Sequence, residues 1–165
     1  YVDKAHPVIV LDTRKTTPGL RVFEKYAVCC GGGTNHRFGL YDAVMIKDNH
    51  IKSAGSIFRA VEKVREALNN INKIEVETQS LDEVQEALDN NVDIIMLDNM
   101  SIDSMREAVK VIDGRAKVEI SGGVTLESLD EISRTGANYV SVGALTQSAP
   151  AVDISMNIVN SSETE

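Results

Sequence analysis

The chain has 165 residues, of which 42% are hydrophobic, so its size and composition suit one folded domain and exclude a disordered chain. Its formal net charge of -8 argues against non-specific nucleic-acid binding, which requires a basic face that neutralises phosphates. The sequence has no apolar run long enough to span a bilayer and no signal-peptide pattern, so we expect no membrane association and a cytoplasmic location.

A short apolar run at residues 8–11 is the first predicted strand, and the basic pair Arg14 and Lys15 follows it within the motif LDTRKTTPG. In parallel α/β domains, ligands bind at the carboxyl ends of the strands. Guanidinium groups match carboxylate and phosphate oxygens in a bidentate manner, so this position predicts an anionic ligand. Taken alone, the segment would be better explained as a solvated basic turn.

The only two cysteines, Cys29 and Cys30, are neighbours in the sequence. Vicinal cysteines rarely bridge because the backbone between them resists the required disulfide geometry. We therefore expect reduced thiols, buried or half-buried on a helix, and no cysteine spacing that indicates a zinc site.

Two further basic groups follow the first one along the chain. His36 and Arg37 precede a predicted strand at residues 43–46, and Lys47 stands directly after that strand. The cations therefore recur at strand ends or in the loops beside them. In a chain that is acidic as a whole, this recurrence predicts one focused anion site on one rim of the sheet.

Short apolar runs alternate with amphipathic segments along the rest of the chain. The six predicted strands lie at residues 8–11, 43–46, 74–76, 94–97, 118–120 and 139–142, and helical spacing of apolar residues occurs over 57–68, 81–88, 102–112 and 126–132. This alternation predicts an α/β fold with a parallel sheet, and it leaves open whether the sheet forms a barrel or a doubly wound layer.

Several residues mark where these helices begin and end. Ser80 and Glu83 fit a capping box, Ser101 and Thr125 stand at predicted N-cap positions, and Gly136 follows the last amphipathic segment. These signals support the predicted helix boundaries.

Acidic residues occupy the middle strands. Alternation places Glu75 and Glu77 on the same side of their strand, with Glu77 nearer the carboxyl end, and Asp98 ends the next strand. We expect Glu75 and Glu119 to be inward-facing acids that a lysine such as Lys47 or Lys117 neutralises.

Two glycine-containing turns follow the last two strands. They are Ser121, Gly122 and Gly123 after residues 118–120, and Val142, Gly143 and Ala144 after residues 139–142. Glycines allow backbone N–H groups to approach a phosphate closely, and α/β barrels often bind phosphate in the loops after their last strands. Together the turns predict a phosphate site.

The motifs LDTRKTTPGLR at residues 11–21 and KYAVCCGGGTNHRFGLYDAVMIKDNHI at residues 25–51 closely resemble the quinolinate phosphoribosyltransferases, also called carboxylating nicotinate-nucleotide pyrophosphorylases. The resemblance extends over residues 1–157. It implies an incomplete, open TIM-like α/β barrel with mainly parallel strands, which forms the catalytic domain, followed by a polar tail at residues 158–165. From the resemblance we expect no counterpart of the family's separate N-terminal domain in these residues, and the family's dimeric assembly implies a homodimer or a multiple of dimers.

The resemblance also implies the reaction: quinolinate and phosphoribosyl pyrophosphate give nicotinate mononucleotide, pyrophosphate and carbon dioxide. It assigns carboxylate binding to Arg14, His36, Arg37 and Lys47, with a further contact from Thr13. The glycine turns are expected to bind the 5-phosphate of the ribosyl group.

Three residues are expected to act most directly in the reaction. The resemblance implies that Lys15 reaches phosphoribosyl pyrophosphate and that Glu77 and Asp98 bind the ribose hydroxyls and Mg²⁺, with all three as catalytic residues. Gln147 stands where the family often has histidine, and glutamine cannot be protonated at physiological pH, so any proton-transfer role there is in doubt.

Three alternatives stay open. The chain could be a related phosphoribosyltransferase that acts on another pyridine or pyrimidine carboxylate. It could be a lyase or aldolase that uses Lys47 as a Schiff-base amine. It could also be an isolated barrel fragment that binds anions without turnover.

Overall fold

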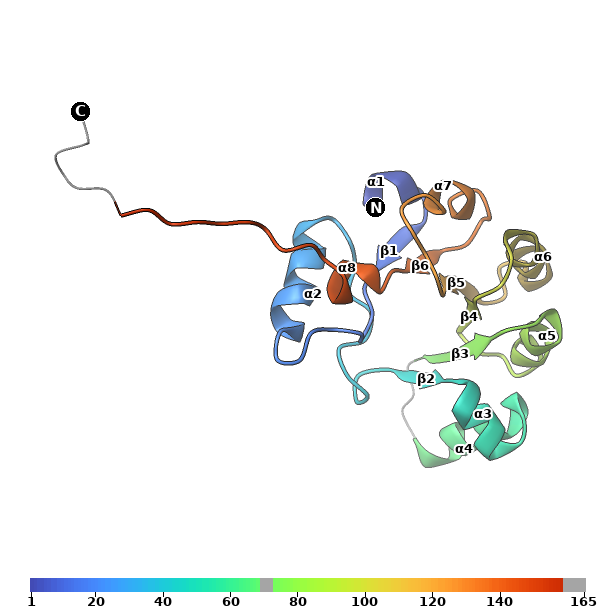
Figure 1. The fold of residues 1–165 in the computed structure, drawn as a ribbon. Coiled ribbons are helices and arrows are strands. Elements are labelled where there is room, and N and C mark those ends of the chain that lie inside the picture. The colour runs from blue at the N-terminus through green and yellow to red at the C-terminus, as the bar shows by residue number, and fades with distance from the viewer. Residues whose placement is uncertain (69–72, 159–165) are drawn as a thin grey trace.

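The computed structural model describes residues 1–68 and 73–158, and within them it contains one parallel sheet with helices around it (Figure 1). The strands are β1 (Ile9–Leu11), β2 (Val44–Ile46), β3 (Ile74–Thr78), β4 (Ile94–Asp98), β5 (Lys117–Ser121) and β6 (Tyr139–Ser141). The helices are α1 (Val2–Ala5), α2 (Arg21–Cys30), α3 (Asp48–Ala54), α4 (Ile57–Ala67), α5 (Leu81–Asp89), α6 (Ile102–Ile112), α7 (Leu129–Ile132) and α8 (Ala144–Gln147). Each predicted strand is confirmed, with small shifts of its ends.

The sheet is open. Its strand order is β1-β6-β5-β4-β3-β2 and every pairing is parallel, so β1 and β2 form the two edges within the described residues. One isolated bridge, between Leu11 and Thr34, extends the β1 edge. Figure 1 shows the strands around a common centre with helices α4 to α7 on the outside. The predicted open α/β barrel is therefore confirmed.

The two faces of the sheet have different side chains because successive residues of a strand point to opposite faces. On the outer face, Val76, Leu97, Ile120 and Val140 are 0% exposed and belong to one apolar core with the helices. The inner face carries acidic, hydroxyl and methionine side chains at the intervening positions. The core therefore lies between the sheet and its helices, and the inner face is left for polar groups.

Of the predicted N-caps, Ser80 and Ser101 are confirmed, and Thr125 is wrong because α7 begins at Leu129 with Ser128 at its N-cap. Ser80 accepts a hydrogen bond from the N–H of Glu83, and Ser101 caps α6 in the same way. Thr125 and Ser128 exchange hydrogen bonds of 3.1 and 3.3 Å in a turn that precedes α7. The helix predicted over residues 126–132 is shorter than expected because the Thr125 turn delays its start to Leu129.

The expectation for the cysteines is half right. Cys29 and Cys30 are unbridged and lie on α2, but both are exposed rather than buried. The reason is that α2 turns only Lys25 and Val28 into the protein. No helix within the described residues is long and apolar enough to cross a membrane, and from residue 159 the predicted polar tail lies outside the described residues.

Candidate active site

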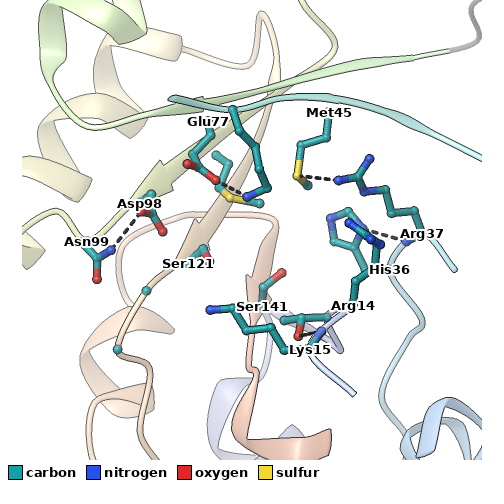
Figure 2. A pocket seen from close by; sticks show the side chains of 15 residues that line it. Arg14, Lys15, His36, Arg37, Met45, Glu77, Asp98, Asn99, Ser121 and Ser141 are labelled. Carbon is teal, nitrogen blue, oxygen red and sulfur yellow. Dashed lines mark hydrogen bonds and ion pairs between the residues drawn. The ribbon is translucent and has the colours of Figure 1, made fainter. Parts of the chain in front are cut away.

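A cavity of about 530 Å³ opens at the carboxyl ends of the strands (Figure 2). Most of the residues predicted from the sequence line it. Its lining consists of Thr13, Arg14, Lys15, His36, Arg37, Met45, Lys47, Glu77, Met96, Asp98, Asn99, Ser121, Gly122, Gly123 and Ser141. The structure therefore brings the three basic groups and the acids of β3 and β4 to one place.

Two arginines face this cavity from different loops. Burial lowers the pKa of Arg37, and the nearby positive charge of Arg14 lowers it further. Arg37 donates to the carbonyl of Ala43 at 3.3 Å, whereas Nε of Arg14 is buried and has no hydrogen-bond partner among the described residues. Two mutually repelling guanidinium groups, one with an unused donor, suit a ligand that carries more than one negative charge.

The loop after β1 fixes the position of Lys15. Its backbone N–H donates to the hydroxyl of Thr13 at 3.0 Å, and its carbonyl accepts from the hydroxyl of Thr146 at 2.5 Å. Thr13 therefore holds the loop through its hydroxyl oxygen, and the ammonium group of Lys15 extends into the cavity (Figure 2).

The acids of the rim already have partners within the protein. Lys47 forms an ion pair with Glu77, which is 8% exposed, and Asp98 accepts a hydrogen bond of 2.9 Å from the side chain of Asn99. The expectation that Lys47 or Lys117 neutralises Glu75 and Glu119 is wrong. Lys47 is attracted to the acid nearer the rim, and Lys117 is exposed at the opposite end of β5.

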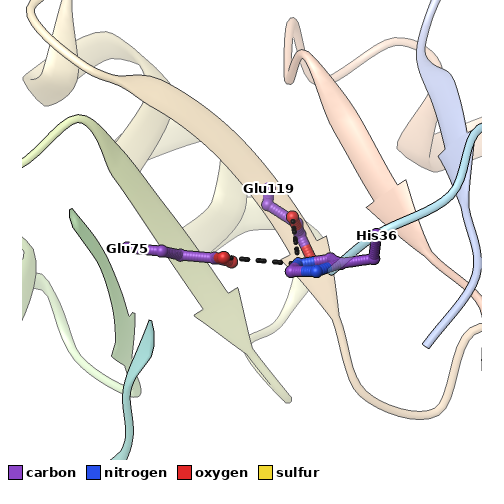
Figure 3. A group of neighbouring side chains, drawn as sticks. All are labelled: His36, Glu75 and Glu119. Atoms are coloured by element: carbon purple, nitrogen blue, oxygen red, sulfur yellow. Dashed lines mark ion pairs between the residues drawn. The ribbon is translucent and has the colours of Figure 1, made fainter. Parts of the chain in front are cut away.

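His36 is the group that lies beside the two deeper acids (Figure 3). Its Nε2 is 3.3 Å from Glu75 Oε2 and 3.4 Å from Glu119 Oε2. Burial alone would lower the pKa of His36, but hydrogen bonds and charge attraction from Glu119 and Glu75 outweigh it and raise this pKa to about 10. Burial also raises the pKa of Glu75. Both shifts favour additional proton binding by the cluster, relative to the same three groups in water.

The same three residues have the ligand types of a metal site, but the histidine geometry argues against one. A metal-bound histidine donates its second ring N–H to a neighbour. Here Nδ1 of His36 instead lies 2.7 Å from the backbone N–H of Arg37, which donates to it, and Nε2 faces the carboxylates. Both ring nitrogens are thus engaged, and the carboxylate contact predicted for His36 stays a prediction.

The two glycine turns differ in their position. Gly122 and Gly123 line the cavity at φ of 90° and 59°, and a Cβ on Gly122 would lie 2.3 Å from the side-chain oxygen of Asn99. The second turn does not line the cavity. Val142 is fully buried and its N–H donates to the carbonyl of Leu11 at 3.0 Å, so it has no free N–H for a phosphate.

Gly143 and Ala144 begin α8 beside the loop of Lys15, and their predicted phosphate contact stays a prediction. The side chain of Gln147 lies against Gly143 and does not line the cavity.

Four lining residues were not predicted: Met45, Met96, Asn99 and Ser141. A period of two could have identified Met45 and Met96, because each stands two residues before a predicted site residue and therefore on the same strand face. Asn99 could have been suggested by its place directly after Asp98.

The chain is thus an open parallel α/β barrel domain with a cation-rich cavity at the carboxyl ends of its strands. The family described as "Quinolinate phosphoribosyl transferase, C-terminal domain" matches residues 1–157. The chain belongs to this family, which confirms the resemblance read from its motifs.

Known relatives agree with this assignment. The chain is 51% identical over 154 residues to the probable nicotinate-nucleotide pyrophosphorylase (carboxylating) of Bacillus subtilis (strain 168), covering 93% of this chain and 53% of the relative. It is 47% identical over 174 residues to the chloroplastic nicotinate-nucleotide pyrophosphorylase (carboxylating) of Arabidopsis thaliana, covering 94% and 50%. The crystal structure of NadC from Streptococcus pyogenes matches with a TM-score of 0.90 at 46% identity, covering 95% of this chain and 56% of that one. The chain thus spans about half the length of the relatives it matches.

Proposed function

We propose that this chain forms the catalytic site for phosphoribosyl transfer from phosphoribosyl pyrophosphate to quinolinate, with decarboxylation to nicotinate mononucleotide. The observation that carries the proposal is the convergence of Arg14, Lys15, Arg37 and Lys47 on one cavity, in a protein whose net charge is -8. Both substrates are anions, and the family membership of residues 1–157 supports their identity.

The arginines suit the acceptor substrate. Quinolinate carries two carboxylates on adjacent ring atoms, and planar guanidinium groups bind carboxylates in a bidentate manner. A dianion would neutralise the repulsion between Arg14 and Arg37 and would supply an acceptor for the unused Nε of Arg14. Nicotinate has a single carboxylate and can do this for only one of the two arginines.

The opposite side of the cavity suits the donor substrate. Lys15 offers a mobile point charge for pyrophosphate, and the Ser121 to Gly123 turn brings backbone close to the cavity. If the pyridine nitrogen is held in line with the departing pyrophosphate, it attacks the anomeric carbon directly. The protein then contributes positioning and electrostatic stabilisation, and we propose that no covalent nucleophile or general base acts in this step.

We also propose Mg²⁺ as the cofactor, held by Glu77 and Asp98. Mg²⁺ prefers oxygen ligands and often binds through one or two carboxylates together with water and substrate phosphates, which fits two acids on a cavity rim. When bound it would neutralise charge on the pyrophosphate oxygens. The ion pair between Glu77 and Lys47 must then loosen. Substitution of Glu77 by Gln should weaken Mg²⁺ binding, so that turnover falls and needs a higher Mg²⁺ concentration, and an unchanged Mg²⁺ dependence would overturn this assignment.

The first test is a calorimetric titration of quinolinate, with nicotinate and inorganic pyrophosphate as comparison ligands, into the folded chain. Selective binding of quinolinate over nicotinate is the expected result. Equal binding of the two would contradict the dicarboxylate site, and preference for nicotinate would favour another pyridine substrate. If the folded chain binds none of them, the alternative of a barrel fragment without its own activity gains support.

A homodimer, or a multiple of dimers, and a cytoplasmic location complete the proposal. Exposed apolar side chains on and beside α2, among them Phe23 at 69% and Tyr26 at 70%, support a surface that a second copy covers. Sedimentation of the chain at increasing concentration tests the assembly. Some relatives are named as chloroplastic or mitochondrial proteins of plants, so fractionation of the source cells is the test of location.

A further inference from the structure

A buried ion pair lies behind the cavity and joins the two segments that carry its arginines. Asp12, directly after β1, is 0% exposed, and Lys25, in α2, is 2% exposed. Nζ of Lys25 donates to Asp12 Oδ1 at 2.5 Å and to the carbonyl of His36 at 3.0 Å. The same oxygen of Asp12 accepts the backbone N–H of His36 at 2.8 Å. The pair therefore fixes both backbone polar groups of the residue that precedes Arg37.

Further contacts of Asp12 extend this connection. The Asn35 amide nitrogen, in the orientation that satisfies its neighbours, lies 2.7 Å from Asp12 Oδ2 and 2.9 Å from the carbonyl of Lys25, so it donates to both. The backbone N–H of Asp12 donates to the carbonyl of Thr34 at 3.2 Å. Every polar group on the Asp12 side chain is thus used to hold residues 34–36 against the end of β1.

Arg21 makes an equivalent connection one helical turn earlier on α2. Its guanidinium donates to the carbonyl of Arg14 at 3.1 Å and to the carbonyl of Phe38 at 3.1 Å, and its Nε donates to the hydroxyl of Thr16 at 3.0 Å. The planar guanidinium of Arg21 therefore connects the loop that carries Arg14 to the segment that carries Arg37. Positions 21 and 25 lie on the same side of the helix because their spacing is one turn.

We propose that Asp12, Lys25 and Arg21 are positioning residues that set the separation of the Arg14 and Arg37 guanidinium groups and thereby select a ligand with two adjacent carboxylates. The inference rests on the function proposed above. None of the three lines the cavity, so they act through the two arginines. Because those arginines repel each other, loosening the α2 contacts lets them move apart. A dicarboxylate needs both arginines at a fixed spacing, whereas a monocarboxylate needs only one.

The test compares quinolinate and nicotinate affinity in the double variant Asp12→Asn/Lys25→Met. Removing only one member would leave an uncompensated buried group, whereas changing both removes the ion pair without a lone charge and keeps a carbonyl oxygen for the N–H of His36. Lys63→Met, an exposed lysine on α4, is the matched control. Pyrophosphate affinity serves as an internal reference because the backbone of Lys15 is held by Thr13 and Thr146 rather than by Asp12 or Lys25.

The expected result is a loss of quinolinate affinity of about 10- to 100-fold, with nicotinate and pyrophosphate affinity within about threefold of the parent chain. A folded double variant with an unchanged quinolinate-to-nicotinate ratio would overturn the inference. If the double variant does not fold, the quinolinate-to-nicotinate affinity ratio is measured in Arg21→Gln instead. An unchanged ratio in that folded variant would likewise overturn the inference.

Hydrogen exchange at the His36 amide separates this inference from the proposed function. If the parent chain shows no preference for quinolinate, the proposed function fails, and the positioning role is then judged by exchange alone. Faster exchange over residues 34–38 in the variants, with Lys63→Met unchanged, supports the connection through α2. Unchanged exchange in a folded variant shows that these residues do not hold the segment.

Discussion

The outer and inner faces of the sheet are built from alternate residues of the same strands, yet their side chains have different roles. On the outer face, Leu97 and Ile120 are 0% exposed and belong to the apolar core. On the inner face, the adjoining residues Asp98 and Glu119 are acidic, and Glu119 is 1% exposed. Burial stabilises the first pair by about 1.5–3 kcal/mol per side chain, whereas burying a carboxylate costs free energy unless it is paired.

This difference assigns the stability of the fold mainly to the outer face and ligand binding to the inner face. The core on the outer face supplies the apolar burial that holds the barrel together, and this allows the inner face to keep buried acids and two like-charged arginines close together. Substitutions on the outer face should therefore lower the free energy of unfolding and leave ligand affinity of the folded protein unchanged. Substitutions of the cavity arginines Arg14 and Arg37 should instead lower ligand affinity and leave the free energy of unfolding nearly unchanged.

The largest effect is expected from Leu97→Ala on the outer face. Leu97 is 0% exposed in the core, and truncating such a leucine removes apolar contacts and leaves a cavity, so we expect a loss of about 3 kcal/mol in the free energy of unfolding. Urea denaturation measures the loss, and titration of the remaining folded protein should give the parent affinity for quinolinate. A loss below about 1 kcal/mol would mean that the outer face is not the main source of stability.

On the inner face, Arg37→Gln should weaken quinolinate binding by about 10- to 100-fold, because charge-assisted hydrogen bonds to a carboxylate are lost. The midpoint of thermal unfolding should not fall, since burial and Arg14 already disfavour the charge on Arg37. Arg59→Gln, an exposed arginine on α4, is the control and should change neither quantity. A large drop in thermal stability for Arg37→Gln would contradict the separation of the two faces.

The cluster of His36, Glu75 and Glu119 should make stability depend on pH in a defined direction. The extra proton can lie on His36, between two carboxylates, or on Glu75, beside a neutral His36. Both arrangements hold the same number of protons, so the pH dependence of the free energy of unfolding has the same sign in each. The pKa of His36 is about 10 in the folded chain against 6.5 for a free histidine. The stabilisation is therefore complete below pH 6.5 and is lost as pH rises toward 10.

Urea midpoints between pH 6 and pH 10 measure this slope. In Glu119→Gln the slope should be shallower, because one of the carboxylates that raises the pKa of His36 is gone while a carbonyl oxygen remains for the hydroxyl of Ser141. The carboxyl groups of Asp42, Asp48 and Glu127, whose pKa values are lowered, titrate below this range and do not contribute to it. An identical slope in Glu119→Gln and the parent chain would show that the cluster does not hold the extra proton.

The sequence predicted the strands and the basic rim well because both depend on local signals. Apolar runs identify the outer face, and cations directly after a strand fall at its carboxyl end, so Arg14 and Lys47 could be placed from sequence order alone. Alternation also placed Glu75 and Glu77 on the same face. These inferences need only the geometry of one strand and the common direction of parallel strands.

The partners of those residues could not be predicted because they depend on contacts far apart in the chain. Glu119 is separated from His36 by 83 positions in sequence numbering, 119 minus 36, and no local pattern indicates that they meet. The burial of Lys25 was missed for the same reason, since a lysine on an amphipathic helix usually faces water. The exposed Cys29 and Cys30 show the converse error, in which residue type predicted burial that the helix orientation does not provide.

The substitution Ser80→Ala, for which we expect the smallest effect, tests the helix layer that covers the outer face. The hydroxyl of Ser80 accepts the N–H of Glu83 at 3.2 Å, which satisfies one free donor in the first turn of α5. The carboxylate of Glu83 also accepts the N–H of Gln79, the residue before the cap, at 2.6 Å. Losing the serine cap should cost about 1 kcal/mol in the free energy of unfolding. Ser53→Ala, the same change at an exposed position within α3, should be neutral or slightly stabilising because alanine has the higher helix propensity. If both faces are independent, neither variant changes quinolinate affinity. A change confined to Ser80→Ala would show that the helix layer also governs the position of Glu77, which precedes this cap by three residues on β3.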